Sequence, residues 1–363
     1  PIAYHCARHG LDIDLLTRGA GFGYMGSTVT SLIYASFTFI FFAIEAAILA
    51  SALQALFGIP MPIGYLLAAV AVLPIVTHGI SAISKFQMGT QPVWLILQVA
   101  ALLVVVGLWS SLVEPGLSRV RQTTIIGLPP GAEPVRLAVI ADIHWGLFFR
   151  DHQLERLVRQ LNALEVDAVL VAGDWTHEPP LDLKTGLAPL AGIRHPVFGV
   201  LGNHDVEAPG PDLTEPLREA LRTHGVQLLE GRRVAWKGWE LVGLDDGWGG
   251  RPEAQIRALW PEASGPATGP GNRLVVTHQP DTVALLPPGA AHLSVAGHTH
   301  GGQIWIPGLT PWVLRNTNTR QPWWNGLYDT SAGTLLVTPG IGTIGLPARL
   351  AVMPTIELVE LKP

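Results

Sequence analysis

The sequence predicts an α/β domain in the C-terminal two thirds of the chain, preceded by a helical membrane region of about three spans. Short apolar runs that are typical of buried strands recur from residue 137 onward, and a polar motif follows or ends each of the first ones. Three long apolar segments precede them, and each approaches or exceeds the length of about 20 residues that crosses a bilayer. We therefore expect a membrane region over residues 1–113, a linker over 114–134 and an α/β domain over 135–363.

The predicted membrane region consists of three apolar segments with two connections. The segments are Thr28–Phe57, Ile63–Ile80 and Val93–Val113. Gly58–Pro62 is short enough for a tight turn, and Gly79–Gln91 reads as a polar loop. A buried core helix is the alternative for any one segment, but three such runs in succession are unusual in a soluble domain.

The charges that flank these segments give a weak indication of orientation. With three spans, Arg8, Arg18 and Lys85 fall on one side of the membrane, and Arg119 and Arg121 fall on the other. This imbalance favours a cytoplasmic N-terminus. We therefore expect a multi-pass protein of a bacterial inner or plasma membrane with its C-terminal domain outside, although one span more or less reverses the orientation.

Composition excludes some classes of function. The 363 residues are 48% hydrophobic and 14% charged, with a formal net charge of −5, and no Lys/Arg cluster lies near the polar motifs. We therefore expect no nucleic-acid binding. Cys6 is the only cysteine, so no intrachain disulfide can form and cysteine usage does not decide the compartment. The oligomeric state is not indicated, and a chain that begins with Pro1 is expected to be a fragment or a processed protein.

The linker and the predicted helices surround the strand pattern. The linker is rich in Pro and Gly and holds a short strand-like piece at Thr123–Ile126. A helix is expected from Asp151, as its cap, to about Leu164, because apolar residues recur on one face. Two further helices are expected at Leu213–His224 and Pro252–Leu259.

Five apolar runs are associated with polar motifs in one fixed order. The runs are Leu137–Ala141, Ala168–Ala172, Val197–Leu201, Leu274–Thr277 and Leu293–Ala296. The motifs are Asp142-Ile143-His144, Gly173-Asp174, Gly202-Asn203-His204-Asp205, His278 and Gly297-His298-Thr299-His300. Open α/β sheets build active sites at the C-terminal ends of strands. Seven Asp, Asn and His side chains that meet there predict two adjacent metal sites with shared ligands and a catalytic histidine beside them.

This ordered set resembles the calcineurin-like metallophosphoesterase family, whose pattern is DxH, GD, GNH followed by D or E, a strand-end His, and GHxH. The run Gly297–Pro307, GHTHGGQIWIP, is similar to a bacterial branch of membrane-associated or exported phosphoesterases, which also shares Asn325–Tyr328 and Gly340–Pro347. The resemblance covers about residues 135–363. It implies two stacked mixed β-sheets flanked by helices, an αββα sandwich. We expect Glu240–Leu244, Leu335–Thr338 and Thr355–Leu361 to complete the second sheet.

The resemblance also implies a role for each polar residue. Asp142, His144, Asp174 and His300 would hold the first metal, and Asp174, Asn203, His278 and His298 the second. The mixed N/O ligand set suits Mn, Fe or Zn. His204 would face the substrate and assist the leaving group, and Asp205 would orient its imidazole. The implied reaction is attack of a metal-bridging hydroxide on phosphorus, in a metal-dependent phosphohydrolase.

The substrate that the resemblance implies is a phosphate ester or pyrophosphate, and the motifs do not separate monoesters, diesters and pyrophosphates. Six tryptophans follow the motifs or lie in the late loops: Trp145, Trp175, Trp305, Trp312, Trp323 and Trp324. Because tryptophan favours membrane interfaces and amphipathic pockets, one hypothesis is a lipid-linked or envelope substrate, with membrane lipid as a partner. The alternative is that these aromatics only pack the core and rim. His177 is a further candidate for the substrate cleft.

A second resemblance concerns the N-terminal region. Asp14–Ser31 and Ile75–Gly79 resemble parts of a nucleobase–cation symporter-type permease, although such permeases have many more helices. We interpret this piece as a degenerate or recombined anchor. The alternative function is a membrane transporter or sensor in which the phosphoesterase-like domain is regulatory.

Overall fold

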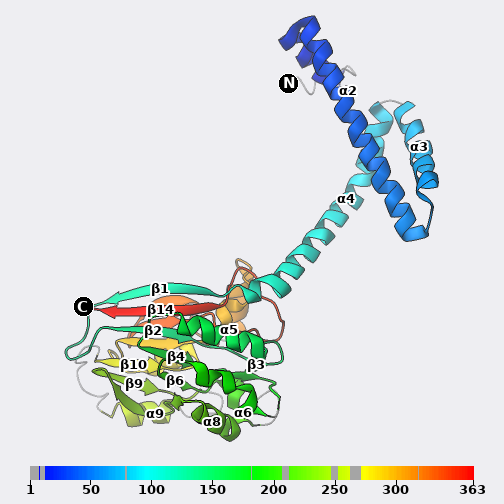
Figure 1. Cartoon of the computed structure of the whole chain (residues 1–363). Coiled ribbons are helices and arrows are strands. Elements are labelled where there is room, and N and C mark those ends of the chain that lie inside the picture. Colours follow the sequence, from blue (N-terminus) through cyan, green and yellow to red (C-terminus); the bar gives the residue numbers. More distant parts are fainter. Residues whose placement is uncertain are drawn as a thin grey trace. The chain divides into compact units, whose positions relative to one another are not determined.

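The computed structural model describes residue 8 and residues 13–77, 80–180, 182–206, 212–246, 252–261, 271–317 and 319–363. The chain divides into two compact units, Pro1–Ala101 and Leu102–Pro363. Figure 1 shows helices α2, α3 and α4 in the first part of the chain and all of the strands in the second. The second unit carries all of the polar motifs.

The first unit is helical, as predicted. Its helices are α2 (Ile13–Phe57), α3 (Met61–Thr77) and α4 (Ile80–Leu108), of which α4 continues into the second unit. Among the described residues, Ala35–Phe57 and Met88–Gly116 are long and apolar enough to cross a membrane, whereas the apolar stretch Met61–Ala71 is shorter. Two candidate spans therefore stand where three were predicted.

The predicted polar loop at residues 79–91 is wrong for the described residues from Ile80 onward. Helix α4 runs through this segment and through Pro92. This segment contains good helix formers such as Ala82, Lys85 and Gln87. Polar residues by themselves do not end a helix. Residues 78 and 79, which belong to the permease-like run, lie outside the described residues.

The second unit contains two six-stranded mixed sheets. The first has the order β1-β14-β2-β4-β6-β7 and the second the order β12-β13-β11-β10-β9-β8. The strands of the first sheet are β1 (Arg119–Ile126), β14 (Thr355–Lys362), β2 (Val135–Ile140), β4 (Ala168–Ala172), β6 (Val197–Val200) and β7 (Val226–Leu228). Those of the second are β12 (Gly326–Thr330), β13 (Gly333–Val337), β11 (Leu293–Ala296), β10 (Arg273–Val276), β9 (Trp239–Gly243) and β8 (Arg233–Trp236). A two-stranded sheet pairs β3 (Trp145–Gly146) with β5 (Thr176–His177).

The remaining elements are short helices. They are η1 (Trp109–Val113), η2 (Glu114–Gly116), α5 (Asp151–Asn162), α6 (Leu183–Gly186), η3 (Ala188–Gly192), α7 (Asn203–Val206), α8 (Thr214–Thr223), α9 (Pro252–Leu259), η4 (Pro280–Leu285), η5 (His300–Gly302) and α10 (Leu309–Thr317). The three predicted helices correspond to α5, α8 and α9.

Three apolar layers hold the sheets and helices together. Helices α5 and α8 pack on one face of the first sheet, where Leu157 and Leu217 join Val169 in one buried cluster. A second cluster fills the space between the sheets, and a third joins the outer face of the second sheet to α9. Figure 1 shows these layers as stacked arrows flanked by ribbons. The helix–sheet–sheet–helix arrangement agrees with the predicted sandwich.

The prediction that Thr355–Leu361 belongs to the second sheet is wrong, because these residues form β14. It lies in the first sheet, parallel to β1 and antiparallel to β2, rather than in the second sheet. Seven of its eight residues are buried, so its sequence lacks the alternation that would identify one covered face. Strand β1 also occupies eight residues of the predicted linker, and residue 114 and its neighbours belong to the helical turns before it.

The start of α5 also differs from the prediction. Arg150 is the N-cap residue, and its backbone N–H donates to the Gln153 side chain. Asp151 is the first helical residue, and it accepts a hydrogen bond from the Trp145 indole at 2.8 Å. The carboxylate therefore lies at the positive end of the helix without capping it.

Candidate metal centre

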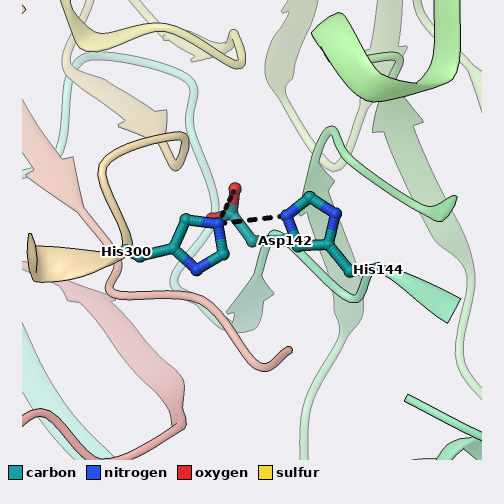
Figure 2. A group of neighbouring side chains, drawn as sticks. All are labelled: Asp142, His144 and His300. Atoms are coloured by element: carbon teal, nitrogen blue, oxygen red, sulfur yellow. Dashed lines mark hydrogen bonds and ion pairs between the residues drawn. The ribbon is translucent and has the colours of Figure 1, made fainter. Parts of the chain in front are cut away.

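The first group of metal-ligand side chains consists of Asp142, His144 and His300, all buried (Figure 2). One ligand atom from each lies within 4.8 Å of the others. The His144 and His300 Nε2 atoms are 3.0 Å apart, and the His300 Nε2 is 3.7 Å from the Asp142 Oδ1. The residues come from the end of β2 and from η5 after β11, so both sheets contribute.

A second group lies beside the first. Asp142, Asp174 and His278 have ligand atoms within 4.8 Å of one another. The Asn203 Oδ1 lies 3.1 Å from the His278 Nε2 and 3.0 Å from the His298 Nδ1. These residues follow β4, β6, β10 and β11, so the parallel strand ends bring together side chains that are far apart in sequence.

Asp174 lies between the two groups. Its Oδ2 is 3.5 Å from the His144 Nε2 and 3.2 Å from the His278 Nε2. Its Oδ1 accepts a hydrogen bond of 3.0 Å from the His204 backbone N–H. A carboxylate in this position can bridge two cations, and the other six residues predicted as ligands are gathered around it.

The donor set fits a pair of cations. The His278 Nδ1 lies 2.8 Å from the Ala172 carbonyl oxygen and donates to it, so in the neutral ring the Nε2 carries the lone pair. That lone pair faces carboxylate and amide oxygens, an arrangement that is unfavourable without a positive charge between them. The Nε2 atoms of His144 and His300 also face each other in the first group, 3.0 Å apart. Imidazole nitrogens with carboxylate oxygens suit first-row transition ions and zinc.

Burial shapes the pKa values of these groups. Burial, reinforced by the Asp174 charge and opposed by His278, raises the pKa of the Asp142 carboxyl to about 7. Burial lowers the pKa of His144 to about 3. Burial alone would raise the pKa of Asp174, but the neighbouring His278 and His144 imidazoles outweigh it and hold this pKa well below its usual range. A bound cation would favour charged carboxylates and neutral imidazoles, as ligation requires.

Five of the seven residues have a backbone that non-glycine residues rarely adopt. Their φ values are 51° for Asp142, 51° for His144, 54° for Asp174, 68° for His298 and 50° for His300. Such positions are strained and concentrate at functional sites. At each of these positions the chain turns sharply after the end of a strand. The turns direct the five side chains towards one point.

Close backbone packing around Asp142 was not predicted from the sequence. A Cβ atom on Gly340 would lie 2.6 Å from the Asp142 Cβ, and one on Gly297 would lie 2.7 Å from the Asp142 Oδ2. The Gly342 N–H donates to the Asp142 carbonyl oxygen at 2.6 Å. The glycine-rich run from Gly340 to Gly345 could have indicated this packing. In the sequence it was noted only as part of the family resemblance, which does not say that these glycines approach Asp142.

His204 lies at the edge of the first group. Its ring centroid is 5.2 Å from that of His144 and 5.0 Å from that of His177, and both contacts are edge-to-face. Its buried Nδ1 has no hydrogen-bond partner within the described part of the chain. His177 therefore lies beside the rings of His204 and His144, and its place in a substrate cleft stays a prediction.

The predicted contact between Asp205 and the His204 ring is not formed. The buried Asp205 carboxylate instead accepts hydrogen bonds from the backbone N–H groups of Gly202, Trp175 and Thr176, and from the Thr176 hydroxyl. These bonds fix the turn after β6 to the turn after β4. Asp205 therefore positions the segment that carries Asn203 and His204 rather than orienting the imidazole.

The tryptophans divide between the core and the surface. Trp145 and Trp175 are buried, and the Trp175 indole donates to the Val200 carbonyl oxygen at 2.8 Å. Trp312 is 64% exposed. Packing thus accounts for Trp145 and Trp175, whereas most of the Trp312 side chain is outside the core.

Comparison with known proteins agrees with this geometry. The family model described as calcineurin-like phosphoesterase matches residues 135–302. The chain is 29% identical to a transmembrane protein with metallophosphoesterase domain from Danio rerio, over 74% of this chain and 62% of that protein. It is 27% identical to the protein of the same description from Bos taurus, over 70% of this chain and 59% of that protein. It is 26% identical to phosphodiesterase YaeI of Escherichia coli K12, over 68% of this chain and 90% of that protein.

The chain thus spans about three fifths of the length of the two vertebrate relatives. The resemblance of the N-terminal region to a permease receives no support from these comparisons and stays a prediction.

Proposed function

Residues 135–302 are a calcineurin-like phosphoesterase domain, and from this premise we propose that the chain is a membrane-tethered two-metal phosphohydrolase. The observation that carries the proposal is Asp174, whose Oδ2 lies within 3.5 Å of imidazole nitrogens from both groups. A bridging carboxylate with ligands on either side is what two closely spaced cations require.

Each predicted ligand keeps its proposed role. Asp142, His144, Asp174 and His300 would hold one cation, and Asp174, Asn203, His278 and His298 the other. When bound, the two ions would provide a nucleophile from water at neutral pH and neutralise charge on the phosphoryl oxygens. Mn, Fe or Zn are the proposed metals.

His204 is the proposed catalytic residue that is not a ligand. Its backbone N–H is fixed on Asp174, while its ring lies beside the His144 ring without a partner at Nδ1. An imidazole so placed can donate a hydrogen bond or a proton to the leaving oxygen. His177, whose ring meets that of His204, would limit how this ring turns.

The tether and the substrate class are proposals of the same kind. Two apolar helices of sufficient length and the transmembrane relatives support a membrane location. The orientation predicted from the flanking charges assumed three spans, and two spans would reverse it. The description of the Escherichia coli relative as a phosphodiesterase makes diesters the first substrates to test. A lipid-linked phosphate diester is the class of substrate that agrees with both the membrane location and the description of the relative as a phosphodiesterase.

The experiment uses the full chain, purified in detergent. Metal content is measured, and hydrolysis of bis-p-nitrophenyl phosphate and p-nitrophenyl phosphate is assayed after chelation and addition of Mn, Fe or Zn. About two metals per chain with metal-dependent turnover is the expected result. Stoichiometric metal without turnover on either ester, or on phospholipid headgroups, would favour the regulatory alternative, and absence of bound metal would overturn the proposal.

A further inference from the structure

We propose that one apolar surface of the catalytic unit lies in the interface of the bilayer that holds α4. This surface, here named the apolar ledge, consists of Ile306, Leu309, Trp312, Val313 and Leu346. The inference rests on the proposed membrane tether and adds a second contact with lipid. Its occupant is a lipid bilayer surface, rather than a partner protein.

The ledge is exposed although its side chains are large and apolar. The exposed fractions are 45% for Ile306, 51% for Leu309, 64% for Trp312, 38% for Val313 and 62% for Leu346. Four of the five lie between Ile306 and Val313 in the chain, and a patch of exposed apolar residues marks an interaction surface.

Helix α10 shows that the exposure is built into the fold. The helix turns Thr310 and Leu314 inward, where they are 6% and 4% exposed. Leu309, Trp312 and Val313 are exposed on the other sides of the helix, at positions that an ordinary surface helix would fill with polar residues. Arg315 and Asn316 are also exposed on this helix, so its outward surface is apolar over the first turns and polar in the last one.

Hydrogen bonds connect the ledge to the end of α4. The Gln303 side chain accepts from the Ile344 N–H and donates to the carbonyl oxygens of Ile344 and Leu346. The Arg349 N–H donates to the Ser110 carbonyl oxygen at 2.8 Å, in the turn that directly follows α4. Figure 1 shows the orange part of the chain at the same end of the domain as the end of α4.

The turn after α4 has the character of a membrane boundary. Trp109 is 46% exposed and Leu112 is 74% exposed, and both belong to η1 within the candidate span Met88–Gly116. Tryptophan is enriched where a span meets the headgroups. Because Arg349, three positions after Leu346, is bonded to this turn, the ledge would meet a bilayer that ends near Trp109.

The charge around the ledge fits an anionic lipid surface. No acidic residue lies between His300 and Asp329, and Arg315 and Arg320 fall in this interval, in a chain whose net charge is −5. Basic residues beside an apolar surface add attraction to anionic headgroups. Six residues separate Ile306 from His300, so the ledge begins within about 20 Å of the metal centre along the chain.

The test places one fluorescent probe at a time in the full chain, in which Cys6→Ser removes the native thiol. Trp312→Cys carries the probe on the ledge, Ile126→Cys carries it at the far end of β1, and Val104→Cys carries it on α4. Ile126 is the matched control because it is also apolar and 77% exposed. Each labelled protein is reconstituted in vesicles of phosphatidylcholine and phosphatidylglycerol with spin-labelled lipid.

The expected result is a blue-shifted probe at 312 that the lipid quenches several-fold more than the probe at 126. A probe at 312 that is not quenched would contradict the proposed contact with lipid. If that probe were nevertheless blue-shifted, protein or substrate would cover the ledge instead. Quenching at 104 reports the tether separately. Quenching at 312 without quenching at 104 would support the ledge and contradict the tether, and neither readout depends on activity.

Discussion

At the scale of single residues, the metal centre depends on backbone that is held in place by its neighbours. The positive φ of a non-glycine residue costs about 1–3 kcal/mol, and it persists only where the surroundings determine it. Around Asp142 the surroundings are glycines that approach to distances no Cβ atom tolerates. Gly340 is the clearest of them, because its φ of 70° excludes side chains as well.

We predict that Gly340→Ala weakens metal binding. The new methyl group would lie 2.6 Å from the Asp142 Cβ and displace this carboxylate from both groups. Disrupting a contact that supports a metal ligand typically lowers metal affinity about 10–100-fold. Competition of the purified variant with a chelator measures the loss.

The matched control is Gly345→Ala. Its φ is 69°, so the added backbone strain is the same, but nothing lies within 4 Å of the new Cβ. Each variant should lose about 1–2 kcal/mol of stability from strain alone. Equal metal affinity in the two variants would show that contact with Asp142 is unimportant.

A second prediction separates ligand from catalyst. Asp174→Asn should abolish activity and lower metal content at both positions, because this carboxylate lies between them. His204→Asn should lower turnover about 10²–10⁴-fold with metal content close to that of the wild type. Elemental analysis beside turnover of bis-p-nitrophenyl phosphate distinguishes the two. If His204→Asn lost a metal, His204 would have to be reassigned as a ligand.

The sequence identified the candidate ligands because each is local to the end of a strand. Order along the chain and the parallel strands together determine that Asp142, Asp174 and His298 meet. The role of Asp205 could not be read in this way, because its partners Trp175 and Thr176 belong to a different turn. Gly340 was likewise recognised only as part of a motif, because the residue that it contacts, Asp142, is far away in the sequence.

At the scale of elements, a buried guanidinium organises the loop between β13 and β14. Arg349 is fully buried, and it donates to the carbonyl oxygens of Pro339, Gly342 and Val352. The Val352 N–H in turn donates to the buried Glu114 carboxylate at 2.9 Å. This loop supports Asp142, so the end of α4 and the metal centre are joined through a continuous set of hydrogen bonds.

We predict that Arg349→Met lowers the free energy of unfolding by about 3 kcal/mol or more, because three carbonyls lose a charged donor. Arg315→Met is the control, since that guanidinium is exposed and only lies over the Trp324 ring at 5.8 Å. It should cost about 1 kcal/mol or less. Thermal unfolding of both variants in the same detergent measures the difference, and similar melting temperatures would contradict the organising role.

Elements were predicted well where one face is apolar and poorly where burial is complete. Helices α5 and α8 have clear amphipathic spacing and were found within a few residues of their predicted bounds. Strand β14 is buried on both faces, so its sheet could not be assigned from its pattern. Strand β1 lies at an edge with many exposed residues, and its partner β14 is more than 200 residues away.

At the scale of the whole molecule, the boundary between anchor and enzyme differs from the one that the motifs indicate. The motifs begin at Asp142, and the family match begins at residue 135. The compact second unit nevertheless begins at Leu102, because the turn after α4 and all of β1 pack on the catalytic domain. The turn after α4 and strand β1 thus belong to the same compact unit as the candidate metal ligands.

This difference predicts the behaviour of truncated chains. A fragment that begins at Glu133 lacks β1 and exposes the edge of β14, which β1 otherwise pairs along eight residues. An unpaired edge of this length promotes association between chains. We expect this fragment to aggregate and to lose metal readily, whereas a fragment that begins at Leu102 should bind about two metals in detergent.

A third fragment, beginning at Leu117, separates the two contributions. It keeps β1 but loses Ser110 and Glu114, the groups that hold Arg349 and Val352. We expect it to be less prone to aggregation than the Glu133 fragment but to bind metal more weakly than the Leu102 fragment. Sedimentation together with chelator competition tests both properties. If the fragments from Leu117 and Leu102 bound metal equally, the turn after α4 would anchor the enzyme without supporting its centre.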